Sequence, residues 1–200
     1  VSQWTATPVE KLTAKFNQDR QRVKPFEPLL LISDMPFDLL ARIESEIIHW
    51  PGLEIITRSK RNYPQGPLFA HILGYVAEAN EQELENDKGL SLGDFVGKQG
   101  LELVLEQRLR GHKGQYQIEV DVLGRNLNRK LVEQPESGEN IELSLDAGIQ
   151  QAAWDAFEGQ AGGLVVMDPD SGKLLALVTS PSFDNNAFAA GLSQKDWVAL

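Results

Sequence analysis

Two blocks punctuated by glycine and proline constrain the fold of this chain more than any other feature. The first block runs from Arg61 to Val76 and the second from Gly97 to Gly114. Glycine adopts positive φ easily, so it favours turns and helix ends, and proline fixes the backbone of turns. The blocks therefore predict short elements separated by tight turns. Their candidate interaction residues are Arg61, Tyr63, Pro64, Gly66, His71, Gly74, Gly97, Gly100, Glu102, Glu106 and Gly111.

Charge and composition exclude several classes of function. The net charge is −10, from 19 basic and 29 acidic residues, which argues against a nucleic-acid partner because phosphate binding depends on cations. The chain has no cysteine, so disulfides and thiolate metal sites are excluded. The glycines do not follow the G-x-G-x-x-G spacing, and Lys98 is not followed by Ser or Thr, so no nucleotide loop is predicted. We expect no cofactor and no metal.

Local patterns predict an α+β chain. A short helix is expected over residues 68–76, closing at Gly74, and an amphipathic helix over residues 101–109, stopped by Gly111. Residues 53–59 are rich in β-branched side chains and predict a strand, and residues 88–100 predict a loop. Alternation predicts a hairpin from residues 115–122 and 126–133, whose turn contains Gly124 and Arg125.

A polar, turn-forming segment at residues 134–138 predicts a domain boundary, with one domain at 1–137 and a second at 138–200. In the second domain, Asp146 is expected to cap a helix. Apolar strands are expected at residues 162–167 and 173–179. A two-stranded ribbon with an open edge can pair with another chain, so we expect a homodimer through that edge.

The first block carries two residues with alternative interpretations. Arg61, beside Tyr63 and Pro64, could bind a partner protein or a glycan, or it could form an ion pair next to a turn fixed by the proline. His71 stands alone in an apolar stretch, which favours a structural histidine over a ligand or a base.

Glu102 and Glu106 are four residues apart and are expected on one side of one helix. Paired carboxylates can hydrolyse a glycan, so an autonomous glycan hydrolase is one hypothesis. The alternative is that both are surface glutamates, which favour helices. A serine acyl-transfer site is not predicted: Ser180 and Ser182 have no lysine three positions later, and no Ser-x-x-Lys or Lys-Thr-Gly occurs.

Several short motifs occur in an order that resembles the class B penicillin-binding proteins, and among them the elongation-specific penicillin-binding protein 2 branch. The resemblance covers residues 61–200 and is weak before them. Its motifs are Arg61-x-Tyr63-Pro64-x-Gly66, Ala70-His71-x-x-Gly74-Tyr75-Val76, Gly97-Lys98-x-Gly100-x-Glu102, the turn from Asp121 to Gly124-Arg125, Leu143-x-Leu145-Asp146-x-x-x-Gln150, and Ser180-Pro181-Ser182-Phe183-Asp184-x-Asn186.

The resemblance implies a pedestal of the penicillin-binding-protein dimerisation-domain type, followed by the first strand, helix and hairpin of a transpeptidase fold. It implies a non-catalytic positioning module in cell-wall elongation. The parent would cross-link peptidoglycan stem peptides through a serine acyl-enzyme and bind β-lactams, with its nucleophile beyond Leu200. An unrelated structural scaffold is the remaining alternative.

The resemblance also implies partners and a location. The partners would be a glycan polymerase of the shape-elongation type and its periplasmic scaffold, and peptidoglycan precursor only through the missing catalytic part. The location would be the periplasmic face of the cytoplasmic membrane, with an anchoring helix that these 200 residues lack; we expect truncation at both ends. For partner binding we expect an exposed apolar patch at Tyr63, Leu68 and Phe69.

Overall fold

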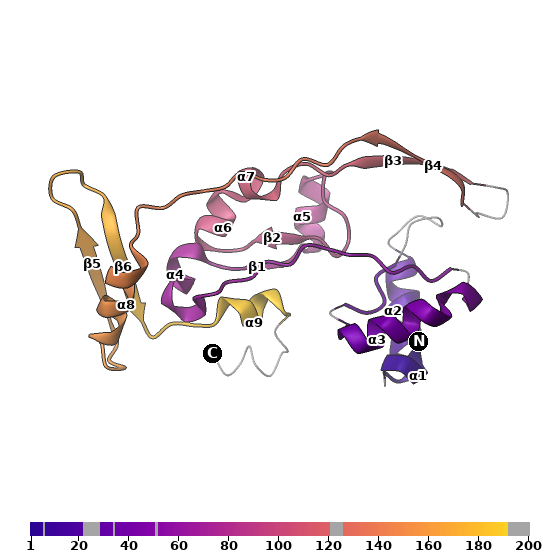
Figure 1. The fold of residues 1–200 in the computed structure, drawn as a ribbon, viewed down its shortest axis with the longest axis horizontal. Helices are drawn as coiled ribbons and strands as arrows, with labels where there is room; N and C mark the ends of the chain where they lie inside the picture. Colours follow the sequence, from indigo (N-terminus) through magenta and orange to yellow (C-terminus); the bar gives the residue numbers. More distant parts are fainter. Residues whose placement is uncertain (6, 22–28, 34, 51, 121–125, 192–200) are drawn as a thin grey trace. The chain divides into compact units, whose positions relative to one another are not determined.

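The computed structural model describes residues 1–5, 7–21, 29–33, 35–50, 52–120 and 126–191 (Figure 1). The chain divides into two compact units. Unit 1 comprises residues 1–59 and 118–130, and unit 2 comprises residues 60–117 and 131–200. Both glycine-punctuated blocks therefore fall in unit 2, together with the segment after residue 138.

Unit 1 is mainly helical. It contains α1 (Ser2–Thr5), α2 (Val9–Arg20), α3 (Phe37–Glu46) and the 3-10 turn η1 (Ile47–His49). The predicted strand over residues 53–59 is wrong, because this segment is irregular in the structure. β-Branched residues fit a strand only where a neighbouring strand is available for pairing, and none pairs with this segment among the described residues.

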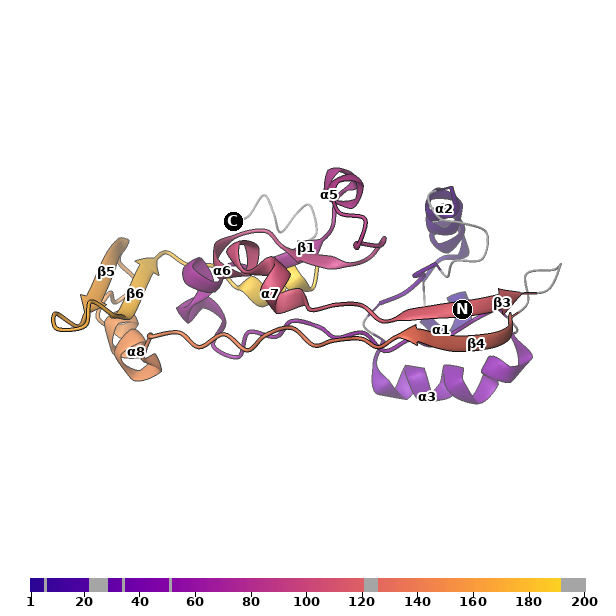
Figure 2. The same cartoon turned by 90° about the horizontal axis from the view of Figure 1, so that it is seen from above.

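The predicted hairpin is confirmed. β3 (Gln115–Val120) and β4 (Asn126–Glu133) pair with each other and run side by side (Figure 2). The turn that joins them, with Gly124 and Arg125, lies outside the described residues.

The first half of unit 2 consists of short elements, as the glycines predicted, but the helix expected over residues 68–76 is correct only for residues 70–73, because Val76 begins a strand. In chain order they are η2 (Gly66–Leu68), α4 (Ala70–Leu73), β1 (Val76–Glu78), α5 (Glu81–Asn86), β2 (Phe95–Gly97), α6 (Gly100–Val104) and α7 (Glu106–Arg110). β1 and β2 are antiparallel, with Val76 opposite Gly97. The sequence interpretation of residues 88–100 as a loop missed β2, because three residues are too few to show a period.

The single helix predicted over residues 101–109 is wrong. It breaks at Leu105, whose φ of −105° and ψ of 13° end α6 and precede α7. Val104, expected on the buried face, is 76% exposed. Glu102 and Glu106 consequently belong to two different helices.

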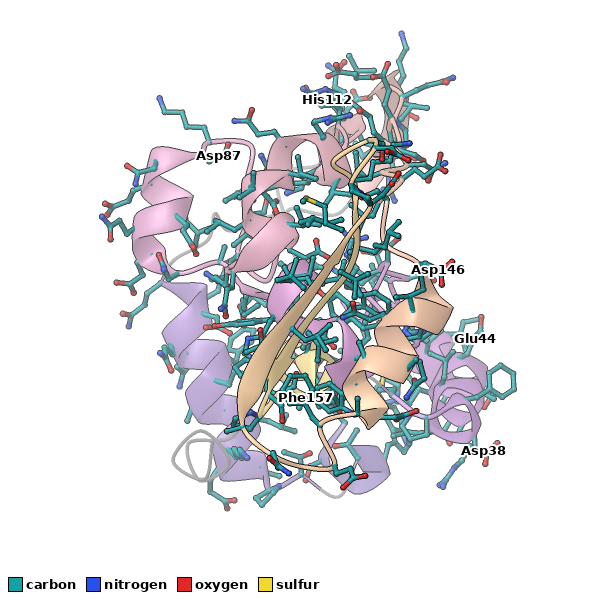
Figure 3. All side chains as sticks on the ribbon, turned by 90° about the vertical axis from the view of Figure 1, so that its left-hand side faces the viewer. Asp38, Glu44, Asp87, His112, Asp146 and Phe157 are labelled. Carbon is teal, nitrogen blue, oxygen red and sulfur yellow. The ribbon has the colours of Figure 1, made fainter. Side chains whose placement is uncertain are left out.

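The second half of unit 2 contains α8 (Ala147–Asp155), β5 (Gly162–Met167), β6 (Leu174–Ser180) and α9 (Asn185–Ala189). The predicted cap is confirmed: the Asp146 carboxylate accepts a hydrogen bond from the Ile149 amide at 2.9 Å. β5 and β6 are antiparallel. Figure 3 shows α8 beside this hairpin, with Asp146 at its start and Phe157 just beyond its end. Their shared core is Ala153, Ala176 and Val178.

Candidate functional site

A buried ion pair joins the two glycine-punctuated blocks. Glu102, near the start of α6, is only 6% exposed. The Arg61 guanidinium meets its carboxylate with two nitrogens, Nε at 2.8 Å from Oε1 and Nη2 at 3.0 Å from Oε2. The Tyr63 hydroxyl donates to the same Oε1 at 3.2 Å. Because Arg61 and Tyr63 are two residues apart in an extended segment, both reach one carboxylate.

The electrostatics of this cluster keep Tyr63 neutral. Burial raises the pKa of the Tyr63 phenol, and the adjacent Glu102 carboxylate raises that pKa further. The phenol therefore remains a hydrogen-bond donor. The structural interpretation of Arg61 holds, since this residue pairs with a carboxylate. The interpretation of Glu102 as a surface glutamate is wrong, since the carboxylate is buried and paired.

Glycines let the two blocks approach each other at the level of the backbone. Gly74 ends α4 with φ of +74°, and a Cβ there would lie 1.8 Å from the Gln99 carbonyl oxygen. Gly100 has φ of +61°, and a Cβ there would lie 2.6 Å from the Ile72 carbonyl oxygen and 2.7 Å from the Gly74 amide nitrogen. Within the second block, a Cβ at Gly97 would lie 2.1 Å from the Glu102 carbonyl oxygen. No larger residue fits these positions without moving main chain.

Glu106 also points inward. Its Oε2 accepts a hydrogen bond from the Gly97 amide at 2.7 Å, and its Oε1 lies 3.7 Å from Arg110 Nε. Gly111 ends α7 with φ of +70°, next to the antiparallel bridge between His112 and Glu136. Neither Glu102 nor Glu106 faces a sugar-sized cleft as a free carboxylate, so the geometry does not favour a glycan hydrolase.

The first block also contacts the segment after residue 180. His71 Nε2 lies 3.0 Å from the Pro181 carbonyl oxygen, and its ring meets Phe183 edge-on with a centroid separation of 5.1 Å. This supports the structural interpretation of His71. Three side-chain amides, all buried or half-buried, also bond to the main chain of the first block: Gln150, Asn185 and Asn186. No pattern in the sequence predicted these contacts.

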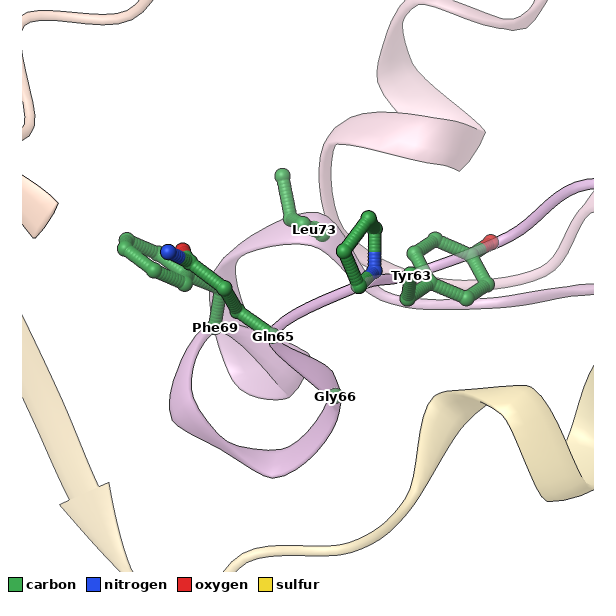
Figure 4. Close-up of a pocket in the computed structure, with 6 residues that line it drawn as sticks. Tyr63, Gln65, Gly66, Phe69 and Leu73 are labelled. Carbon is green, nitrogen blue, oxygen red and sulfur yellow. The ribbon is translucent and has the colours of Figure 1, made fainter.

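An open pocket of about 280 Å³ lies along the first block (Figure 4). It is lined by Tyr63, Pro64, Gln65, Gly66, Phe69 and Leu73. The expected exposed patch is wrong for Tyr63 and Phe69, which are 5% and 9% exposed, and Leu68 is half-buried. Tyr63 is buried because it packs with Val76 and with Ala189 of α9 and bonds to Glu102 of α6.

The described residues offer no acyl-transfer arrangement. The Ser182 hydroxyl donates to the Pro67 carbonyl oxygen at 2.7 Å, and no lysine is positioned to activate it. In the part of the chain that the structure covers, no helix is long and apolar enough to cross a membrane.

Residues 1–143 match the family model of the penicillin-binding protein dimerisation domain. A relative named peptidoglycan D,D-transpeptidase MrdA from Acinetobacter baumannii is 40% identical, covering 80% of this chain and 24% of the relative. The Escherichia coli protein of the same name is 33% identical, covering 94% of this chain and 30% of that protein. The chain therefore spans about a quarter to a third of these curated relatives.

Comparison with solved structures gives the same grouping. A complex between the penicillin-binding protein PBP2 and MreC from Helicobacter pylori matches with a TM-score of 0.81 and 27% identity, covering 100% of this chain and 37% of that chain. Pseudomonas aeruginosa PBP2 in complex with WCK 5153 matches with a TM-score of 0.60 and 34% identity, covering 74% of this chain and 29% of that chain.

Proposed function

This chain belongs to the penicillin-binding protein dimerisation-domain family, and from that membership we propose that it is the non-catalytic positioning module of a peptidoglycan D,D-transpeptidase. The proposal rests on what the motif residues do in the structure. Arg61 and Tyr63 both bond to the buried Glu102 carboxylate, and the same block is hydrogen-bonded to residues after 180. Such residues hold a platform in place and perform no chemistry themselves.

The parent protein would cross-link stem peptides through a serine acyl-enzyme in cell-wall elongation. The relatives named peptidoglycan D,D-transpeptidase support this proposal. The nucleophile would lie beyond Leu200, and the parent would bind β-lactams at the periplasmic face of the cytoplasmic membrane. We retain 1–137 as the pedestal and 138–200 as the start of the transpeptidase domain.

Labelling with a fluorescent penicillin tests whether the acyl-transfer serine lies outside these 200 residues. The 200-residue chain should give no covalent adduct by mass spectrometry, because no serine in it has an activating lysine. The chain extended to the full length of its relatives should be labelled at one serine. A stoichiometric adduct on the 200-residue chain would contradict the proposal, and so would an unlabelled full-length protein.

The partner of this module would be a periplasmic elongation scaffold of the MreC type, and a glycan polymerase of the shape-elongation type would act with it. The support for the scaffold is the similarity to PBP2 in its complex with MreC. Because Tyr63 and Phe69 are buried, the exposed apolar side chains of unit 1 are better candidates for this contact. Phe37 is 79% exposed, Ile48 81% and Trp50 53%.

Calorimetric titration with the periplasmic part of an MreC protein tests this contact. Phe37→Ala and Ile48→Ala should each weaken binding by about tenfold, as expected for interface anchors. Val104→Ala in α6 is the matched control, since Val104 is 76% exposed and lies in unit 2. Equal affinities for all three variants would contradict the assignment to unit 1.

A homodimer through the edge of β5 remains part of the proposal. Among the described residues β5 pairs only with β6, and Val165 and Met167 are 58% and 56% exposed. Light scattering should therefore give a dimer whose dissociation constant rises with Val165→Lys, because a charge on the edge strand opposes pairing. A monomer at all concentrations would rule this dimer out.

A further inference from the structure

The motif from Ser182 to Asn186 bonds to the first block, but the function proposed above does not explain why these residue types stand there. Asp184 caps α9, its carboxylate accepting a hydrogen bond from the Asn186 amide at 2.9 Å. Asn185 and Asn186 then occupy the first two helical positions. Asparagine is a poor helix former there, and Asn185 is completely buried. These two amides therefore need an explanation other than helix formation.

Asn186 holds the main chain of a single distant residue at two points. Its Oδ1 accepts from the Tyr63 amide at 2.9 Å, and its Nδ2 donates to the Tyr63 carbonyl oxygen at 2.9 Å. The side-chain amide thus bonds to both backbone groups of Tyr63, as a neighbouring β-strand would. The two residues are 123 positions apart.

The neighbouring motif residues make the same kind of contact. Asn185 Nδ2 donates to the Gly74 carbonyl oxygen at 3.2 Å, and the Ser182 hydroxyl donates to the Pro67 carbonyl oxygen at 2.7 Å. Residues 63–74 contain only short helical turns, in which the Gly66 amide bonds to the Tyr63 carbonyl and the Phe69 amide to the Pro67 carbonyl. The three side chains of the motif add bonds to these two carbonyls and also bond the Tyr63 amide and the Gly74 carbonyl.

The opposite side of residues 63–74 is held by the second block. The Tyr63 phenol is bonded to Glu102 in α6, and the Gly74 backbone packs directly on Gln99 and Gly100. Tyr63 and Gly74 are therefore each fixed from two sides, by the α6 region on one and by α9 on the other. Figure 1 shows α4 and β1 beside α6 and α9.

We propose that residues 182–186 form a docking latch, which recognises the main chain of residues 63–74 and couples the position of α9 to that of α6. Recognition through backbone groups requires the block to adopt one conformation. The hydrogen bonds of the latch therefore form only when the block is correctly folded. The inference concerns only contacts within unit 2 and does not depend on the proposed function.

Hydrogen exchange on the 200-residue chain tests the latch. Asn186→Ala removes two hydrogen bonds, so the amides of Tyr63 and Gly74 should exchange about tenfold faster. The amide of Leu105, which donates to Leu101 at the end of α6, should do the same. Amides of the β5–β6 hairpin should keep their wild-type rates. The exposed Asn140 provides the control variant Asn140→Ala, which should change none of them.

If the amide exchange rates of Tyr63 and Gly74 are unchanged in Asn186→Ala, the proposal is wrong. It is also wrong if the Tyr63 amide exchanges faster while the exchange rate of the Leu105 amide stays the same. If Asn186→Ala does not fold, Ser182→Ala decides. It removes one exposed hydrogen bond to Pro67 and should accelerate the Leu68 and Phe69 amides by about threefold. No acceleration in that variant would also refute the latch.

A double-mutant cycle tests the coupling between α9 and α6. Asn186 bonds to the main chain of Tyr63, and Glu102 bonds to its phenol, so Tyr63 connects the two residues directly. The double variant Asn186→Ala, Glu102→Gln should be destabilised less than the sum of the two single effects. Its unfolding equilibrium constant should be about tenfold smaller than the value expected for additive effects. Asn186→Ala with Glu85→Gln, an exposed position in α5, should be additive. Additivity in both pairs would refute the coupling.

Discussion

The environment of Glu102 in the structure differs from the one that its sequence suggests. In the sequence it is a glutamate in an acidic chain, which suggests a solvated helix face. In the structure it is 6% exposed and accepts hydrogen bonds from Arg61 and Tyr63. A buried charge of this kind is tolerated only when its partners are in place. The carboxylate therefore stabilises the contact between the blocks.

Glu102→Gln should destabilise the chain by about 2 kcal/mol, because an amide offers donors where Arg61 and Tyr63 already donate. The value is modest for a buried ion pair because the Arg61 side chain is 38% exposed and can be solvated. Urea unfolding measures the difference. Glu85→Gln is the control at an exposed position, and equal losses for the two variants would mean that the cluster contributes nothing.

Tyr63 should make stability fall at alkaline pH. Burial raises its pKa in the folded chain above the unfolded value of 10.0. The folded state therefore binds this proton more tightly, so the stabilisation is complete below pH 10 and is lost as the pH rises above it. Tyr63→Phe should flatten this alkaline loss, measured by urea unfolding across that range. Tyr116→Phe, at a 49% exposed position, should leave it unchanged.

At the scale of elements, the sequence predicted those that are set by local pattern. α8 with its Asp146 cap, β5, and the β3–β4 hairpin all follow from periodicity and turn chemistry within a few residues. What it did not predict depends on distant partners. Gln150 is completely buried because its amide bonds to Leu68 and Leu177, and nothing near Gln150 in the sequence indicates either contact.

The burial of Glu102 and the contacts of the α9 asparagines were not predicted, for the same reason. One signal was nevertheless present in the sequence: two adjacent asparagines, which form helices less readily than alanine or leucine, follow Asp184.

The junction of α4 and α6 is sensitive to a single methyl group. Gly74→Ala should cost more than about 3 kcal/mol, because its Cβ would lie 1.8 Å from the Gln99 carbonyl oxygen, and main chain cannot move aside cheaply. Gly172→Ala is a matched control: its φ of +71° is close to the +74° of Gly74, but nothing lies within 4 Å of its Cβ. That variant should cost only about 1 kcal/mol of backbone strain.

Urea unfolding of the two glycine variants separates steric crowding from backbone strain. Similar losses would mean that φ alone matters and that the two blocks are not closely packed. A larger loss at Gly172 than at Gly74 would contradict the packing directly.

In the whole molecule, the domain boundary predicted at residue 137 does not coincide with the boundaries of the two compact units. The polar segment 134–138 and the family match over residues 1–143 suggest a module that ends there. The contacts instead group residues 60–117 with residues 131–200. A module that is continuous in sequence can still require a later segment in order to fold.

Removing residues 139–200 should therefore unfold the first half of unit 2. Six hydrogen bonds to residues 63–74 would be lost, from Gln150, Ser182, Asn185 and Asn186 and between His71 and Pro181. At about 1 kcal/mol each, together with the burial of Val76 against Ala189, this loss is comparable to the whole stability of a typical domain. In a 1–138 chain, amides of the β1–β2 ladder should exchange at least about tenfold faster than in a 1–191 chain. Equal protection in the two chains would show that residues 1–137 fold independently, and the contacts across residue 138 would then be a docking interface between two finished domains.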